Sequence, residues 1–209
     1  MFHVKQSSEA WGILGGLLRE LCLPISALSP LMAHAAAVQR EGDRLGLVST
    51  QDLRGVVLRH TADSLLFAIA RRPEPGEAWA DVGSGAGFPG LPLAVCFPQT
   101  TFTLIEPQQR RAGFLNVVST DLGAANVRVE AKRAYDVSSR FDVVVARALA
   151  DPKAALQTCE GLATEAGCVI LALGAQSYPH PGARLVDVLR SGVDSPGRLL
   201  IMSAPRGDT

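Results

Sequence analysis

Apolar residues at three- and four-residue spacing predict helices in the first third of the chain. The residues with this period in the first helix are Ile13, Leu14, Leu17, Leu18 and Leu21. Ser7 or Ser8 is placed to cap that helix, and Pro24 and Pro30 interrupt the helical pattern. The alanine-rich segment 31–40 predicts a second helix, which is followed by a turn at 42–49. A third helix is predicted over 52–70. The prolines and glycine of 71–76 end this region.

After residue 76 the pattern changes to short apolar runs that alternate with helical periodicity. The predicted strands are 78–82, 101–106, 126–130, 141–146 and 168–173, and the predicted helices between them are 91–97, 108–122 and 152–163. A last strand at 199–202 can pair with 184–189 as a hairpin. Strands that are apolar almost throughout are typical of a parallel sheet covered on both faces. The pattern predicts an α/β fold over 73–209, preceded by a helical region over 1–72.

The amino-acid composition indicates a large hydrophobic core and no net charge. The chain has 209 residues, of which 47% are hydrophobic and 19% charged, so it can bury a sizeable core. A formal net charge of zero excludes a strongly basic nucleic-acid binder but permits a local basic face. The cysteines are widely spaced, which favours buried thiols over a zinc site. We therefore expect no bound metal. No membrane span or signal peptide is visible in the sequence, so we also expect no association with a membrane and a cytoplasmic location.

Candidate chemistry concentrates in the segment DVGSGAGFPG at 81–90, directly after the first predicted strand. Glycine permits positive φ and lets backbone N–H groups approach a ligand, so this turn predicts an adenosine-like ligand. Two classes of ligand fit. A dinucleotide would place its pyrophosphate at the following helix, as in Rossmann oxidoreductases that use nicotinamide cofactors, whereas S-adenosylmethionine has no phosphate. Phe88 and the prolines beside it favour the adenosyl ligand.

Two acidic residues accompany the glycine turn. Glu106 ends the second predicted strand at the spacing of the dinucleotide fingerprint, where a carboxylate can accept hydrogen bonds from both ribose hydroxyls. Asp81 has two interpretations that stay open together. Its carboxylate can meet an amino group of the ligand, or it can stabilise the turn through backbone N–H groups.

Several motifs in order give the chain a specific resemblance. They are RHxxDS at 59–64, DVGSGAGFPGLP at 81–92, Glu106 followed by RRxxFL at 110–115, and SRFD at 139–142 leading to ARA at 146–148. Together, over about residues 45–175, they resemble the RsmG (GidB) family, which methylates N7 of one guanine in small-subunit (16S) ribosomal RNA with S-adenosylmethionine. The resemblance implies a Rossmann-like methyltransferase fold with a helical N-terminal extension, over 73–209 and 1–72 respectively.

The resemblance also assigns roles to residues. It implies cofactor contacts from Asp81, the turn glycines, Phe88, the ribose-binding Glu106, a segment after the third strand, and an arginine at the mouth of the site. These residues are Asp81, Gly83, Gly85, Gly87, Phe88, Glu106, Ala134, Tyr135 and Arg147, with Arg147 as the catalytic residue. Arg110, Arg111 and Arg133 are expected to bind RNA, unless they are only solvated cations. Guanine N7 is an exposed lone pair and needs no general base. His60 and Asp63 are therefore expected to brace the N-terminal helices against the pocket.

The chain departs from the family pattern on the expected RNA side. Residues 46–50 read GLVST where the family has an Asn-Leu-Thr type of segment, Leu173 replaces the usual lysine, and 175–182 is rich in proline. A degenerate relative that binds S-adenosylmethionine without methylating rRNA therefore stays open beside the methyltransferase. The expected partner is 16S ribosomal RNA or the small ribosomal subunit, acted on by a monomer.

Overall fold

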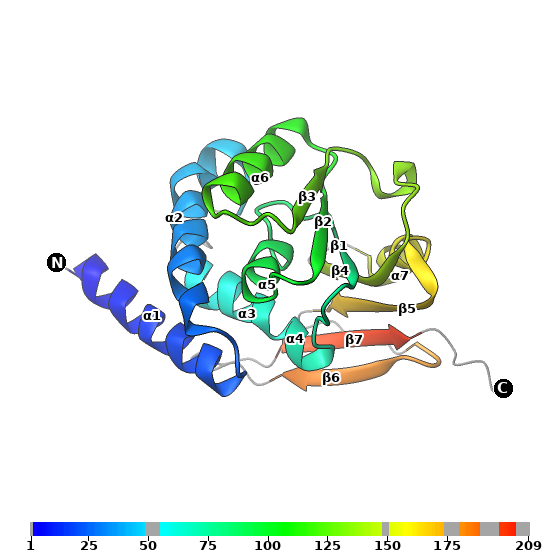
Figure 1. Cartoon of the computed structure of the whole chain (residues 1–209), viewed down its shortest axis with the longest axis horizontal. Helices are drawn as coiled ribbons and strands as arrows, with labels where there is room; N and C mark the ends of the chain where they lie inside the picture. The colour runs from blue at the N-terminus through cyan, green and yellow to red at the C-terminus, as the bar shows by residue number, and fades with distance from the viewer. Residues whose placement is uncertain (1, 49–54, 148–150, 174–179, 189–196, 204–209) are drawn as a thin grey trace.

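A seven-stranded sheet forms the centre of the molecule in the computed structural model (Figure 1), which describes residues 2–48, 55–147, 151–173, 180–188 and 197–203. The strands are β1 (Ala78–Val82), β2 (Thr101–Ile105), β3 (Val127–Glu130), β4 (Phe141–Arg147), β5 (Ala163–Ala172), β6 (Arg184–Val188) and β7 (Gly197–Ser203). Their order is β3-β2-β1-β4-β5-β7-β6. The first five are parallel, and β7 runs antiparallel to both β5 and β6. The predicted parallel sheet and C-terminal hairpin are confirmed.

The connections reverse direction at β1. The chain passes from β1 to β2 and β3 on one side, and then returns to β4 on the other side of β1. In open α/β sheets, ligands bind at such a switch point, outside the carboxyl ends of the strands. The turn after β1 and the end of β4 meet there, since Val82 pairs with Ala146.

Helices cover both faces of the sheet. They are α5 (Gly90–Cys96), α6 (Gln109–Asp121), the short 3₁₀ segment η4 (Ala134–Asp136) and α7 (Pro152–Glu160). Side chains of successive strand residues alternate between faces. Trp79 and Val143 pack with Leu93 of α5, whereas Ala80 and Val144 pack with Leu156 of α7. The sheet is therefore buried on both faces, as its apolar strands indicate.

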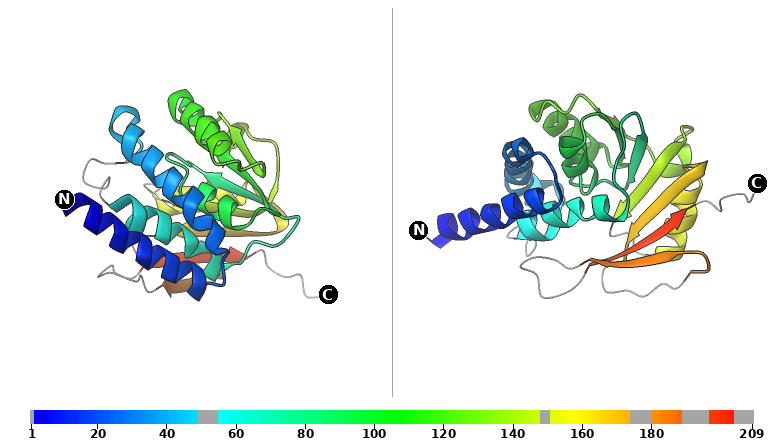
Figure 2. Two further views of the ribbon diagram at one scale, coloured as in Figure 1. Left: turned by 60° about the vertical axis from the view of Figure 1, so that its left-hand side comes forward. Right: turned by 60° about the horizontal axis from the view of Figure 1, so that its bottom comes forward.

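The N-terminal third is helical, as predicted, and lies along one side of the sheet domain (Figure 2). Its elements are α1 (Phe2–Glu20), η1 (Ile25–Ala27), α2 (Leu28–Leu45), the π-helical segment η3 (Val56–Ala62), α3 (Asp63–Leu65) and α4 (Phe67–Ala70). Leu14 and Leu31 share a hydrophobic cluster with Leu91 and Phe114 of the sheet domain. The core thus crosses the predicted boundary between 72 and 73, and the division into two domains stays a prediction.

Several predicted element ends were wrong. Helix α1 begins at Phe2, so Ser7 and Ser8 lie inside it and do not cap it. Helix α2 begins before Pro30, because proline is tolerated in a first turn, and it continues to Leu45, where Gly46 ends it with φ 57°. The expected turn therefore starts later than residue 42.

The helix predicted over 152–163 ends at Glu160, and β5 begins at Ala163 rather than at Cys168. Thr164 and Glu165 interrupt the apolar pattern, so this first half of the strand was not predicted. Cys96, Cys159 and Cys168 are buried as expected, but Cys22 is exposed. Parts of some predictions fall outside the described residues, namely 49–54, 148, 174–179 and 189.

Candidate functional site

The glycine turn between β1 and α5 needs its glycines. Gly83, Gly85 and Gly87 have φ values of 72°, 54° and 93°, in the left-handed region that side chains with a Cβ rarely adopt. A Cβ on Gly87 would also lie 2.5 Å from Leu91 Cδ1. The turn therefore combines a special backbone conformation with close packing against α5.

Asp81 stabilises the end of this turn at Gly90 through a buried hydrogen bond. Its side chain is buried, and Oδ2 accepts a hydrogen bond from the Gly90 N–H at 3.0 Å. Burial raises the pKa of Asp81 to about 7, while the Gly90 N–H and Ser84 act in the opposite direction. Among the described residues, the buried Oδ1 has no hydrogen-bond partner. Asp81 thus stabilises the turn, and its second oxygen is left for another donor.

Glu106 fixes the near end of the turn. It follows the last residue of β2, and its buried carboxylate accepts from the Gly85 N–H through Oε2 and from the Gln108 N–H through Oε1, each at 2.9 Å. Each carboxylate oxygen has a second acceptor position, so these bonds leave capacity for ribose hydroxyls. The expected ribose role stays a prediction.

A cavity of about 450 Å³ opens beside these residues. The parts of the chain that line it come from the glycine turn, the end of β2, the N-terminal helices, α6 and β4. The lining residues are Leu47, Val48, His60, Gly83, Ser84, Gly85, Ala86, Phe88, Glu106, Pro107, Gln108, Arg111 and Arg147. It lies at the switch point of the sheet, where a ligand is expected. Leu47 and Val48 were not among the predicted cofactor residues, because they fall in the turn predicted at 42–49.

Phe88 is the centre of a side-chain cluster at one wall of the cavity. Its buried ring has its centroid 4.6 Å from that of His34 and 5.4 Å from that of His60. The guanidinium carbon of Arg147 lies 5.3 Å from the Phe88 ring centroid, a cation–π distance. Phe88, which distinguishes this turn from a phosphate-binding turn, therefore packs against residues of the N-terminal helices and of β4.

His34 connects α2 to the glycine turn, a link that sequence reasoning missed. It is fully buried, and its Nε2 lies 2.7 Å from the Ala86 carbonyl oxygen. Because a carbonyl only accepts, Nε2 carries the hydrogen and donates. Burial lowers the pKa of His34 to about 4, so the imidazole is neutral at pH 7. A polar residue within the apolar face of the predicted helix was the one available signal.

Arg147 is the last residue of β4 and reaches back to the N-terminal helices. Its Nη2 donates to His60 Nδ1 at 2.7 Å, and its Nη1 donates to the Arg59 carbonyl at 3.3 Å. The RHxxDS segment thus orients the arginine that was expected at the mouth of the site. This contact agrees with the bracing role expected of His60, and the catalytic role of Arg147 stays a prediction.

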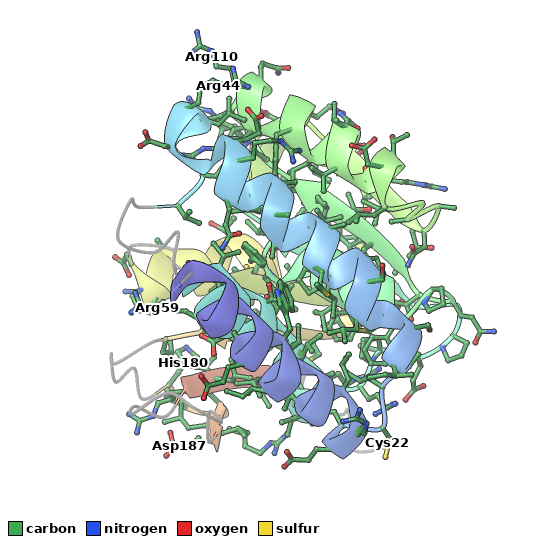
Figure 3. The ribbon with its side chains drawn as sticks, turned by 90° about the vertical axis from the view of Figure 1, so that its left-hand side faces the viewer. Cys22, Arg44, Arg59, Arg110, His180 and Asp187 are labelled. Carbon is green, nitrogen blue, oxygen red and sulfur yellow. The ribbon has the colours of Figure 1, made fainter. Side chains whose placement is uncertain are left out.

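The structure does not gather all the predicted site residues. Tyr135 is 74% exposed, and its hydroxyl accepts a hydrogen bond from Arg133 at 2.8 Å. Ala134 packs against the hydrophobic cluster that contains Leu156 of α7. Ala134 and Tyr135 do not line the cavity, and neither do Asp81 and Gly87. Arg111 does, and its Nη2 donates to the Gly46 carbonyl at 2.5 Å. Arg110 does not line the cavity, and its label lies at the same end of the molecule as that of Arg44 in Figure 3.

Comparison with known proteins decides the family. The model of the GidB family, described as rRNA small subunit methyltransferase G, matches residues 28–180. The chain belongs to this family. It is 35% identical over 184 residues to ribosomal RNA small subunit methyltransferase G of Cellvibrio japonicus, covering 82% of this chain and 84% of the relative. The protein of the same name from Geobacillus kaustophilus is 32% identical over 179 residues, covering 82% and 75%.

Solved structures support the fold. A mutant of MtNAS in complex with S-adenosylmethionine has a TM-score of 0.56 at 21% identity, over 80% of this chain and 72% of that one. A SAM-dependent methyltransferase from Aquifex aeolicus has a TM-score of 0.52 at 16% identity, over 68% and 89%. The GidB-family chain is thus a Rossmann-like methyltransferase by fold, and the family assignment overturns the oxidoreductase alternative. No helix in the described part is long and apolar enough to cross a membrane.

Proposed function

We propose that this GidB-family protein is an S-adenosylmethionine-dependent methyltransferase that acts on N7 of a guanine in 16S ribosomal RNA. The observation that carries the proposal is the cavity at the switch point, which joins an intact glycine turn to Glu106 in a chain of this family. The substrate is either free 16S RNA or the same RNA within the small ribosomal subunit. The cytoplasmic location and the monomeric state belong to the same proposal.

The residues present fit an adenosyl cofactor. The turn has open backbone at Gly85, where the nearest atom to an added Cβ is 3.8 Å away. Asp81 has an unused buried acceptor, and Glu106 retains acceptor positions towards the cavity. Phe88 provides an apolar ring instead of the phosphate-binding donors a dinucleotide would need. Asp81, Glu106 and the turn would hold the cofactor, which when bound supplies a methyl group on a sulfonium.

The remaining requirement of the reaction is orientation. Guanine N7 presents its lone pair without losing a proton, so no general base is needed. The rate then comes from alignment of the attacking nitrogen with the methyl group and the sulfur. Arg147, held by His60 and the Arg59 carbonyl at the end of β4, is placed to orient the base. We assign Arg147 this role in catalysis, with no proton transfer.

Methylation of RNA from a deletion strain tests the proposal directly. Unmodified 16S RNA and small subunits from that strain are incubated with the protein and S-adenosylmethionine, and N7-methylguanosine is mapped by mass spectrometry. We expect one modified guanine. S-adenosylhomocysteine binding without any methylation would instead establish the degenerate relative.

Cofactor binding tests the role of Glu106 separately. Glu106→Ala leaves ribose hydroxyls and two backbone N–H groups unpaired, at about 1–3 kcal/mol, or roughly 5- to 150-fold in the Kd of S-adenosylhomocysteine. Glu160→Ala, at an exposed residue of α7, is the matched control and should leave Kd unchanged. Equal Kd values for both variants would refute the ribose role.

A further inference from the structure

A second hollow of about 760 Å³ lies between α2 and α6, and it shares no lining residue with the cofactor cavity. Its polar rim carries arginines from both helices, and its floor is apolar. The lining residues are Arg40, Glu41, Arg44, Leu45, Arg110, Gly113, Phe114, Val117, Val118 and Asp121. Arg110 is the lining residue to which a role is given above, as an expected RNA contact.

The end of the hollow near Arg110 has a surplus of positive charge. Among the lining residues, Glu41 is the carboxylate at this end, and it pairs with both Arg40 at 3.6 Å and Arg44 at 2.7 Å. Asp121, at the other end of α6, is about 16 Å from Arg110 along the helix axis. Among the lining residues, Arg40, Arg44 and Arg110 therefore outnumber the acid at this end of the hollow. Figure 3 shows Arg44 and Arg110 at the same end of the molecule.

These arginines are available to a ligand. The side chains of Arg40 and Arg44 are 67% and 73% exposed. Ion pairs at such exposure contribute about 0–1 kcal/mol, so an incoming phosphate can replace them at little cost. Guanidinium groups bind phosphate through paired N–H donors. Val117, 60% exposed, adds an apolar surface for sugars or bases.

The hollow adjoins the cofactor cavity. Arg110 lines the hollow, whereas its neighbour Arg111 lines the cavity. On the facing segment, Leu45 lines the hollow and Leu47 lines the cavity. The hydrogen bond from Arg111 to the Gly46 carbonyl joins the two segments at the residues where the lining of the hollow gives way to that of the cavity. A polymer strand that passes these residues can contact both places at once.

We propose that the α2–α6 hollow binds the sugar–phosphate backbone of the RNA substrate beside the target guanine. The inference rests on the proposed function, and it assigns Arg40 and Arg44 of the N-terminal helices to the RNA interface together with Arg110. An RNA strand suits the site better than a protein surface, because arginines on two walls with an apolar floor match alternating phosphates and sugars. It also explains how a chain of zero net charge can hold RNA: the positive charge is local.

The test neutralises the rim without touching the cofactor cavity. The triple variant Arg40→Gln, Arg44→Gln, Arg110→Gln is compared with a control triple at exposed arginines on other elements. The control substitutions are Arg19→Gln on α1, Arg128→Gln on β3 and Arg184→Gln on β6. Both triples remove the same charge. For each we would measure the KM for unmodified 16S RNA and small subunits, the Kd for that RNA by filter binding, and the Kd of S-adenosylhomocysteine.

We expect the rim triple to raise KM and RNA Kd at least tenfold and to reduce the salt slope of log K by about 2, since each lost phosphate contact contributes about 0.7. The Kd of S-adenosylhomocysteine should stay within twofold of the parent. Equal effects from the two triples, or an unchanged RNA Kd, would overturn the inference. Loss of activity on subunits alone, with RNA binding unchanged, would instead assign the hollow to a ribosomal protein. A parent that binds RNA through the rim but methylates no guanine would refute the proposed function alone.

Discussion

Two buried ionisable groups beside the glycine turn should affect stability in opposite directions as the pH changes. His34 holds the turn through the Ala86 carbonyl, and Asp81 holds it through the Gly90 N–H. Both are almost completely enclosed, and burial favours the neutral form of each. Because one is a base and the other an acid, the same environment makes one sensitive to acid and the other sensitive to base.

The contribution of His34 is lost as the pH falls. Its pKa is lowered from 6.5 to about 4 in the folded protein. Between these values the unfolded chain binds a proton that the folded protein does not, so stability decreases towards low pH. At about 1.4 kcal/mol per pH unit, the full loss is about 3 kcal/mol. His34→Gln keeps an N–H donor and removes this titration.

The contribution of Asp81 changes with the opposite sign. Its pKa is raised from 3.8 to about 7, chiefly by burial; the Gly90 N–H, Ser84 and Arg147 lower it and Glu106 raises it. Between these values the folded protein retains a proton that the unfolded chain has lost, so stability decreases as the pH rises. The full loss is about 4 kcal/mol. Asp81→Asn removes this titration and keeps the shape of the side chain.

The free energies of unfolding in urea are measured for the parent and the two variants between pH 4 and pH 7.5. The difference between each variant and the parent isolates the contribution of the substituted residue, because the other titratable groups contribute equally to both proteins. Relative to the parent, His34→Gln should gain about 3 kcal/mol on going from pH 7.5 to pH 4. Asp81→Asn should gain about 4 kcal/mol in the opposite direction. Two flat difference curves, or two curves of the same sign, would refute the reasoning.

Three further substitutions test the local geometry by urea unfolding at pH 7. Gly87→Ala should cost about 2–5 kcal/mol, from left-handed backbone strain and overlap with Leu91, and a stable variant would contradict the packing. Gly113→Ala, with open space around the added Cβ in α6, should instead stabilise by about 0.5–1 kcal/mol, and a loss would show hidden contacts. Asp151→Ala should cost about 1 kcal/mol, because Asp151 caps α7 through the Lys153 N–H at 2.8 Å; no change would rule out the cap.

The sheet was predictable because its residues carry local and consistent signals. The strands at 78–82 and 141–146 are apolar except for Asp81 and Asp142, and each is bounded by a turn. The same approach failed where local signals mislead. The first half of β5, 163–167, was left out of the predicted strand because Thr164 and Glu165 break the apolar run. Its place in the sheet is set by pairing of Ala163 with Phe141. Long-range pairing of this kind leaves no mark in one sequence.

The candidate site was predictable only in part, for a related reason. The glycine turn and Glu106 follow from spacing within one strand–turn–helix unit, and the structure joins them by the hydrogen bond between Gly85 and Glu106. Tyr135 was expected in the pocket, yet it is exposed and paired with Arg133. His34 was not predicted at all, because its partner Ala86 lies in a distant part of the chain and only the folded core brings them together.

The position of Phe88 explains why the N-terminal helices belong to the site. His34 from α2 and His60 from η3 contact the Phe88 ring, and His60 also receives a hydrogen bond from Arg147 of β4. A reaction that needs alignment but no general base depends on how rigidly such residues are held. The helical extension therefore positions Phe88 and Arg147 at the cavity through these contacts. A change in how α2 packs should alter the glycine turn before it alters the sheet.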